Sequence, residues 1–361
     1  MRAAFTVIRI SSKPRLSLSV RTLVLIAAIG LLCCAPTRSR AQQPERPPQE
    51  PLRVRTELVK LGATVLDKRG NFVPGLDRKR FRILDGGTDQ PIVFFVPVEA
   101  PAHIFVLVET SPAVYLIHDE HLLAAYALLD GLAPDDQVAL ASYDESPRPL
   151  LGFTPDKAAL LATLGQLQYM VGMGQLNCYD SLSAVLDWLA PVSGKRAIVA
   201  ITTGLDTSPP AHWDALAEKL RRDDVVIYPV AIGGWLRAHP ERKARSMKNT
   251  PKSDAPTKEA SSASGDAAIW DKADDGLRHI AAMTGGHAYF ASSVREFPSL
   301  YRQIASALRH EYVLGISPQH DGQFHALKVE ILDSKGQPIP SGKGGPEYGV
   351  FARPGYLAPP R

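Results

Sequence analysis

Cysteine is scarce in this chain of 361 residues, which contains three. Two of them, Cys33 and Cys34, lie in an apolar run close to the N-terminus, so Cys178 is the one thiol in the remainder of the sequence. A single thiol excludes an internal disulfide framework. The protein must therefore be stabilised by a sizeable apolar core, which a chain of this length can form.

An excess of positive charge is also missing once the first 41 residues are set aside. Those residues hold seven of the 41 Lys and Arg residues and no Asp or Glu, which leaves 34 basic and 37 acidic residues and a formal net charge of −3. Proteins that bind nucleic acid carry a basic patch or a high net positive charge. We therefore expect no nucleic-acid partner.

The apolar run LVLIAAIGLLCCA, residues 23–35, is shorter than the roughly 20 residues that a membrane-spanning helix needs. Basic residues precede it and the small residues around Ala41 follow it, which predicts a signal peptide over residues 1–41. We expect an exported protein, periplasmic, envelope-bound or secreted, with no transmembrane helix in the mature chain. An uncleaved anchor and a lipoprotein attached at Cys33 or Cys34 are the alternatives.

The rest of the chain divides by composition. A Pro- and Gln-rich linker is expected at 42–51, a β segment at 52–100, a domain of alternating strands and helices at 101–310, and a second β segment at 311–361. Residues 236–268 are poor in large apolar side chains, which predicts a disordered insertion. A solvated loop is the preferred interpretation of this segment, and a basic tether for an acidic partner is the alternative.

The fold class follows from the kind of strand in the central region. HIFVLVE, DQVALASYD, RAIVAITTG and VVIYPVAIG are continuous apolar runs separated by helical patterns, and RPLLGFT follows the second closely enough for an antiparallel edge strand. Such strands are buried on both faces. The sequence predicts a doubly wound α/β domain with a mostly parallel sheet, and a small β module formed by the N- and C-terminal flanking strands.

Ligands of such folds bind at the carboxyl ends of the parallel strands. Glu109, Thr110 and Ser111 follow the first strand, Asn177 precedes a helix, and Thr203 and Asp206 follow the ITTG strand. These six residues are the predicted ligand-binding site. Asp206 has a second interpretation, as a turn or cap residue.

The ETS turn, the CYDSL helix start, the ITTGLD strand end and the flanking EYVLGISP and ARPGY stretches resemble von Willebrand factor A domains. More narrowly, they are similar to the acidobacterial group of exported proteins that carry this domain. The resemblance covers roughly residues 52–358. It implies a non-enzymatic domain that binds proteins, in many members through one divalent ion held by a D-x-S-x-S turn, a Thr and an Asp, the metal ion-dependent adhesion site.

This chain departs from that metal pattern. The positions of the pattern fall on Glu109, Ser111, Ala113, Leu176 and Thr203, so Ser111 alone is unchanged. The extra methylene of Glu109 moves its oxygens about 1.5 Å further out than those of Asp, and Mg²⁺ bonds are near 2.0 Å. We expect a degenerate metal site, no cofactor, and protein binding without strong metal dependence. The alternative is a weak Mg²⁺ or Mn²⁺ site at Glu109, Ser111 and Thr203.

An enzyme is the third hypothesis, because Cys178 starts a helix whose dipole lowers a thiol pKa. A catalytic cysteine needs a histidine beside it, so a small buried residue is the preferred interpretation. His118 and His121 lie three residues apart, without the spacing of a helical zinc motif, and indicate a solvated helix face. DKADDG lacks the length and final Glu of a calcium loop.

Overall fold

The computed structural model describes residues 57–115, 118–169, 174–234, 262–339 and 348–360. The predicted signal peptide and linker lie outside the described residues, as do residues 236–261 of the predicted insertion. Within the described part of the chain, no helix is long and apolar enough to cross a membrane.

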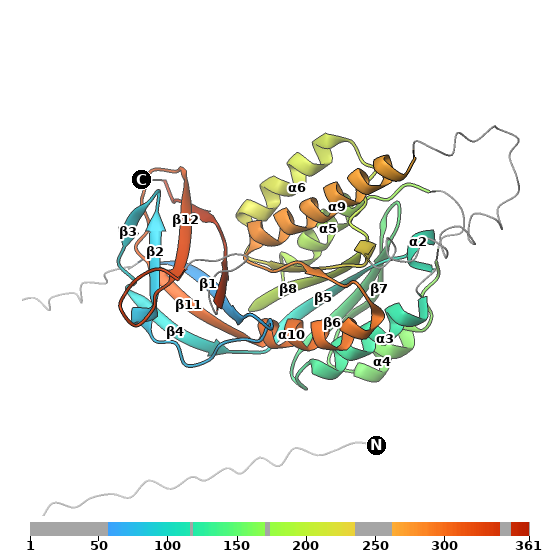
Figure 1. Ribbon diagram of the computed structural model, residues 1–361, viewed down its shortest axis with the longest axis horizontal. Helices are drawn as coiled ribbons and strands as arrows, with labels where there is room; N and C mark the ends of the chain where they lie inside the picture. Colours follow the sequence, from blue (N-terminus) through green and yellow to red (C-terminus); the bar gives the residue numbers. More distant parts are fainter. Residues whose placement is uncertain (1–56, 116–117, 170–173, 235–261, 340–347, 361) are drawn as a thin grey trace, which may run out of the picture. The chain divides into compact units, whose positions relative to one another are not determined.

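The central sheet has six strands in the order β10-β9-β8-β5-β6-β7. Figure 1 labels β5, β6, β7 and β8 of this sheet. All neighbouring pairs are parallel except β6 with the edge strand β7. This confirms the predicted fold class, including the antiparallel edge strand. The strands are β5 (Ala102–Glu109), β6 (Gln137–Tyr143), β7 (Pro147–Thr154), β8 (Lys195–Thr202), β9 (Val226–Ala231) and β10 (Tyr289–Phe290).

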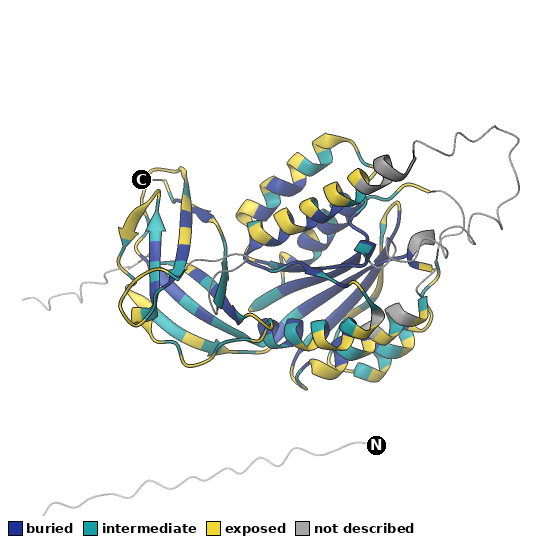
Figure 2. Ribbon diagram, in the orientation of Figure 1, coloured by how far each residue is buried: buried dark blue, intermediate teal, exposed yellow. Residues whose placement is uncertain are grey.

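Helices cover both faces of this sheet because its strands are apolar on both. In β5, Ile104, Val106 and Val108 face one buried cluster, and Phe105 and Leu107 face the other. The first cluster is closed by α3 (His118–Gly131), α4 (Lys157–Leu164) and α10 (Phe297–Arg309), and the second by α5 (Cys178–Leu189), α6 (Pro210–Arg222) and α9 (Ser262–Thr284). Figure 2 shows the resulting buried sheet between two layers of helices with exposed outer faces.

The predicted end of the disordered insertion, at residue 268, is wrong because helix α9 covers its last residues. It begins at Ser262, so residues 262–268 are helical rather than disordered. Ala is the strongest helix former, and Ala263, Ala267 and Ala268 extend the helix ahead of the buried residues Ala273 and Leu277 that anchor it. Low apolar content was therefore a poor guide to disorder at this boundary.

The flanking segments form two four-stranded sheets around one buried cluster. Their orders are β13-β1-β11-β4 and β14-β12-β2-β3, so each sheet combines strands from both ends of the chain. The N-terminal strands are β1 (Val59–Asp67), β2 (Phe81–Asp85), β3 (Thr88–Gln90) and β4 (Phe94–Glu99), and the C-terminal strands are β11 (His310–Ile316), β12 (Phe324–Ile331), β13 (Tyr348–Ala352) and β14 (Gly355–Leu357).

Two apolar stretches of the predicted β segment 52–100 determine how this β module is paired. The FVPGL stretch forms no strand, since it contributes a single bridge from Phe72 to Leu66 ahead of Pro74 and Gly75. The PIVFFVPV run pairs with β11 and not across the Gly86-Gly87 turn, where β2 pairs with the short strand β3. Both glycines of that turn have positive φ, which is why the chain reverses there so tightly.

Candidate functional site

The predicted site residues lie where β5, β6 and β8 end at the carboxyl edge of the sheet. The parallel register places Glu109 beside Tyr143, and Thr202 ends the neighbouring strand β8. Gly204 follows with a φ of 75°, and a Cβ there would lie 2.8 Å from the Leu277 side chain. The chain can therefore turn sharply after Thr203 only because residue 204 is glycine.

The Glu109 carboxylate is completely buried, and it is surrounded by uncharged donors. Oε1 accepts from Ser111 Oγ at 2.6 Å, and Oε2 accepts from the Thr203 backbone N–H at 2.7 Å. The Thr203 hydroxyl lies 3.0 Å from Oε1 and 2.8 Å from Oε2. We call Glu109, Ser111, Tyr143, Thr202 and Thr203 the carboxylate network.

Tyr143 and Thr202 complete this network from the far side. The Tyr143 hydroxyl and Thr202 Oγ1 lie 2.5 Å apart, and each is within reach of Oε2, at 3.1 and 2.9 Å. One of their two protons is used between them, so the pair gives one proton to the carboxylate. Burial, with smaller effects of Cys178 and Glu109, raises the pKa of Tyr143 well above its ordinary value, so this phenol remains a donor.

Four donated protons therefore meet one carboxylate: one from Ser111, two from Thr203 and one from the Tyr143–Thr202 pair. A carboxylate offers about four lone-pair positions. The acceptor capacity of Glu109 is thus filled by the protein itself. A divalent cation would have to displace these donors, so the residues present do not fit a metal ion at this position.

The remaining predicted residues form hydrogen bonds within the surrounding loops and do not contact the Glu109 carboxylate. Thr110 is buried and donates to the Tyr143 carbonyl at 3.1 Å. Asn177 is half-buried and donates through Nδ2 to the Glu145 carbonyl at 2.7 Å. Asp206 accepts from the Tyr179 backbone N–H at 2.8 Å and from Ser208, which confirms its interpretation as a cap and turn residue.

The structure thus brings Glu109, Ser111 and Thr203 together and leaves Thr110, Asn177 and Asp206 outside the carboxylate network. Leu176, at the position of the metal-binding Thr, is held through its backbone by Thr207. Tyr143 and Thr202 were missed. A signal for both was present, since each lies near the carboxyl end of one of the apolar runs DQVALASYD and RAIVAITTG, and in the structure each is the last residue of its strand.

A charged pair borders the network on its β7 side. Arg148 donates to both oxygens of Asp144, at 2.8 and 2.5 Å, and to Thr110 Oγ1 at 3.3 Å. Burial opposes ionisation of Asp144, but the Arg148 hydrogen bonds and charge outweigh it and lower the pKa of Asp144. At this edge of the sheet, the exposed side chains of Arg148, Glu145 and Thr207 therefore surround the buried carboxylate network, in which the groups that donate to Glu109 are uncharged.

Cys178 lies behind the same centre. Its Sγ is buried and lies 4.0 Å from Thr202 Oγ1. Burial raises the pKa of this thiol to about 12, which outweighs any effect of the helix start. Among the described residues, no group of three or more His, Cys, Asp or Glu side chains is arranged to hold a metal ion, and DKADDG lies within α9. His118 packs edge-on against Tyr169 rather than standing in solvent.

The chain is similar to known proteins in its structure. No family model and no curated protein matches the chain. Among solved structures, von Willebrand factor type A from Catenulispora acidiphila is 12% identical, with a TM-score of 0.43, over 83% of this chain and 74% of that one.

An aerotolerance-related membrane protein from Bacteroides fragilis is 13% identical, with a TM-score of 0.37, over 56% of this chain and 97% of that one. Proximal thread matrix protein 1 from the mussel byssus, with a zinc-occupied MIDAS motif, is 15% identical, with a TM-score of 0.39, over 60% of this chain and about half (49%) of that one. The matches thus include the domain type that the sequence resembles. At these identities and TM-scores, no ligand or activity is transferred to this chain.

Proposed function

We propose that this chain is an exported, non-enzymatic protein-binding module, and that the strand-end face of its α/β domain binds its partner without a metal ion. The observation that carries the proposal is the carboxylate network: the buried Glu109 is satisfied by four protein donors in the place where a metal would be held. A partner must then be recognised by the side chains around that centre. Export rests on the signal-like residues 1–41.

The neighbouring loops support this proposal because they are fastened to one another. Thr207 N donates to the Leu176 carbonyl at 2.7 Å, Leu176 N donates to the Thr207 hydroxyl at 2.9 Å, and Asn177 N donates to the Asp144 carbonyl at 2.9 Å. Ordered loops lower the entropy cost of binding. Gln175, Thr207 and Glu145 present exposed polar groups there. The edge is therefore a preorganised surface whose shape does not depend on a cation.

The metal-dependent alternative is tested by calorimetric titration of the protein with Mg²⁺ and Mn²⁺. We expect no binding tighter than millimolar. A submillimolar dissociation constant that is lost in both Glu109→Ala and Ser111→Ala would overturn the metal-free proposal.

Protein binding itself is tested by capture from an envelope fraction with EDTA or with Mg²⁺. Thr207→Arg, on the exposed strand-end surface, should abolish retention of the captured protein, whereas Lys335→Glu, in an exposed loop of the β module, should not. Retention that disappears in EDTA, or that is equally lost in both variants, would contradict a metal-free strand-end interface.

The cysteine hydrolase hypothesis receives less support. The Cys178 thiol is protonated at neutral pH, and its hydrogen-bond partners in the described part of the chain are the hydroxyls of Thr202 and Tyr143. A thiol reagent should therefore label native Cys178 no faster than a buried thiol. Rapid labelling at neutral pH would reopen the enzyme hypothesis.

A further inference from the structure

The β module contains a histidine held between two carboxylates from different segments. His325, on β12, lies with Nδ1 3.0 and 3.1 Å from the oxygens of Asp85, at the end of β2. Its Nε2 lies 3.1 and 3.2 Å from the oxygens of Asp321, in the loop that precedes β12. The side chains are 17% exposed for His325, 10% for Asp85 and 38% for Asp321.

The protonation state of His325 decides whether both contacts can exist. A doubly protonated ring has two N–H donors, one for each carboxylate, whereas a neutral ring has one donor and one lone pair. In the neutral ring one nitrogen lone pair would face carboxylate oxygens, which is repulsive. Asp85 belongs to a strand and is the more buried, so the loop residue Asp321 is the partner that separates.

The titratable groups that face the ring are Asp85, Asp321 and Tyr356. Burial opposes charging of His325, but the two carboxylates outweigh it and raise the pKa of the imidazole. The Gln323 backbone N–H, with a further contribution from His325, lowers the pKa of Asp321. Burial raises the pKa of Tyr356, whose ring stacks on His325 at 5.3 Å, so this phenol is neutral throughout the relevant range.

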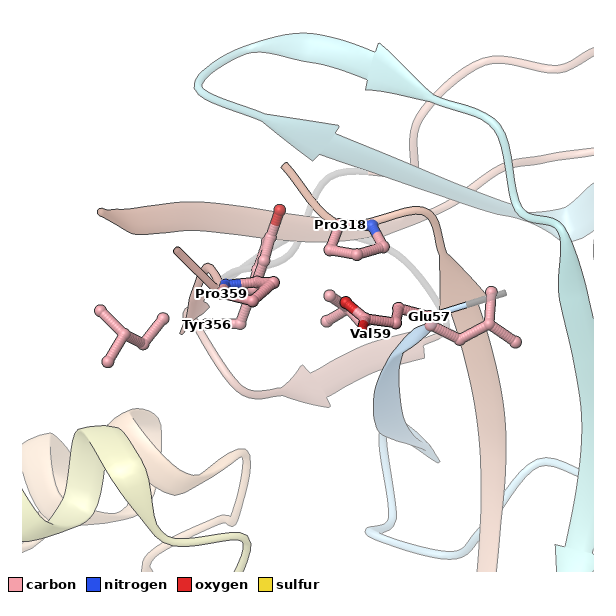
Figure 3. A pocket seen from close by; sticks show the side chains of 7 residues that line it. Glu57, Val59, Pro318, Tyr356 and Pro359 are labelled. Atoms are coloured by element: carbon pink, nitrogen blue, oxygen red, sulfur yellow. The ribbon is translucent and has the colours of Figure 1, made fainter. Parts of the chain in front are cut away.

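The loop that carries Asp321 is joined to the C-terminal segment. Gln319 N donates to the Tyr356 hydroxyl at 3.0 Å, and Ala358 N donates to the Gln323 carbonyl at 2.8 Å. A hollow of about 420 Å³ lies beside these contacts, with Pro318 and Tyr356 among its lining residues (Figure 3). Figure 3 also shows Pro359 and Glu57 at this hollow, so movement of the loop would change its walls.

We propose that Asp85, His325 and Asp321 form a pH-responsive latch, which holds the loop of residues 317–323 against strands β2 and β14 while His325 is doubly protonated and releases Asp321 when the ring loses a proton. The latch regulates access to the hollow of Figure 3. It is independent of the strand-end face, so a failure of the proposed function leaves it untouched.

The test is an NMR titration of the isotope-labelled full chain between pH 5 and 9. At pH 6 both ring nitrogens of His325 should carry protons, and the midpoint should lie above the ordinary value of about 6.5. The amide signals of Gln319 and Gln323 should move with the same midpoint. A ring with one proton at pH 6, a midpoint at or below 6.5, or amide signals that do not follow the ring would overturn the latch.

Two variants separate the latch from a general effect of charge. Asp321→Asn, in a partly exposed loop, should lower the His325 midpoint by about half a unit or more, and the Gln319 amide should no longer follow the ring. His320→Gln changes an exposed histidine of the same loop, which lies 3.3 Å from Glu57, and should leave the midpoint unchanged. An unchanged midpoint in Asp321→Asn, or an equal shift in His320→Gln, would contradict the proposal.

Discussion

The α/β domain and the β module each hold a carboxylate at a junction between chain segments, but they do so with opposite chemistry. Glu109 is fully buried and accepts from hydroxyls and a backbone amide, none of which titrates near neutral pH. Asp321 is partly exposed and depends on a histidine, whose charge changes in that range. The first arrangement gives a fixed centre, and the second gives an adjustable one.

Removing the fixed centre should have the largest effect on stability. Glu109→Ala leaves buried donors of Ser111, Thr202 and Thr203 without their acceptor, so we expect a loss of about 3 kcal/mol in the free energy of unfolding. Urea unfolding measures this loss. Glu145→Ala, at an exposed position of the same edge, is the control and should change the value by less than about 0.5 kcal/mol. A loss below about 1 kcal/mol for Glu109→Ala would mean that the donors find other acceptors.

The sequence was sufficient for the fold and for part of this centre. Continuous apolar runs predicted the strands β5, β6, β8 and β9, and their parallel order predicted that Glu109, Ser111 and Thr203 would converge. The direction of the Glu109 side chain was not predictable from that pattern. It depends on Tyr143 and Thr202, which lie 34 and 93 residues away and come into reach only through the strand register.

The contacts of the latch were also not predictable from the sequence. Asp85 and His325 are 240 residues apart, and they meet because β2 and β12 pair in one sheet. Neither residue belongs to a recognisable motif. A pattern of alternating apolar residues predicts that strands exist, but it does not say which strands from the two ends of the chain become neighbours.

A smaller effect is expected from one donor of the fixed centre. Tyr143→Phe removes one of the two paired hydroxyls at Glu109 Oε2 but leaves Thr202 and the other donors in place, so about 1 kcal/mol of stability should be lost. Tyr301→Phe is the matched control, because Tyr301 is also fully buried and its hydroxyl has no hydrogen-bond partner among the described residues. Removing that hydroxyl should be neutral or slightly stabilising. Equal losses in the two variants would argue against a specific role for the Tyr143 hydroxyl.

The adjustable centre should give the smallest change in stability and the clearest dependence on pH. Because the folded protein raises the pKa of His325, the stability from its contacts is complete below about pH 6.5 and is lost as the pH rises through the raised value. Screening by solvent limits this contribution to under about 1 kcal/mol. Urea unfolding at intervals from pH 6 to 9 should therefore show that the stability difference between wild type and His325→Gln declines as the pH rises, whereas His320→Gln keeps the pH dependence of wild type.

The same series contrasts the two centres within one experiment. Tyr143→Phe should lower the unfolding free energy by the same amount at each pH, because the pKa of Tyr143 lies well above this range and the hydroxyls around Glu109 do not titrate in it. His325→Gln should instead differ from wild type mainly below the raised His325 pKa, where wild type retains the latch. If Tyr143→Phe shows the pH dependence and His325→Gln does not, the assignment of fixed and adjustable centres is wrong.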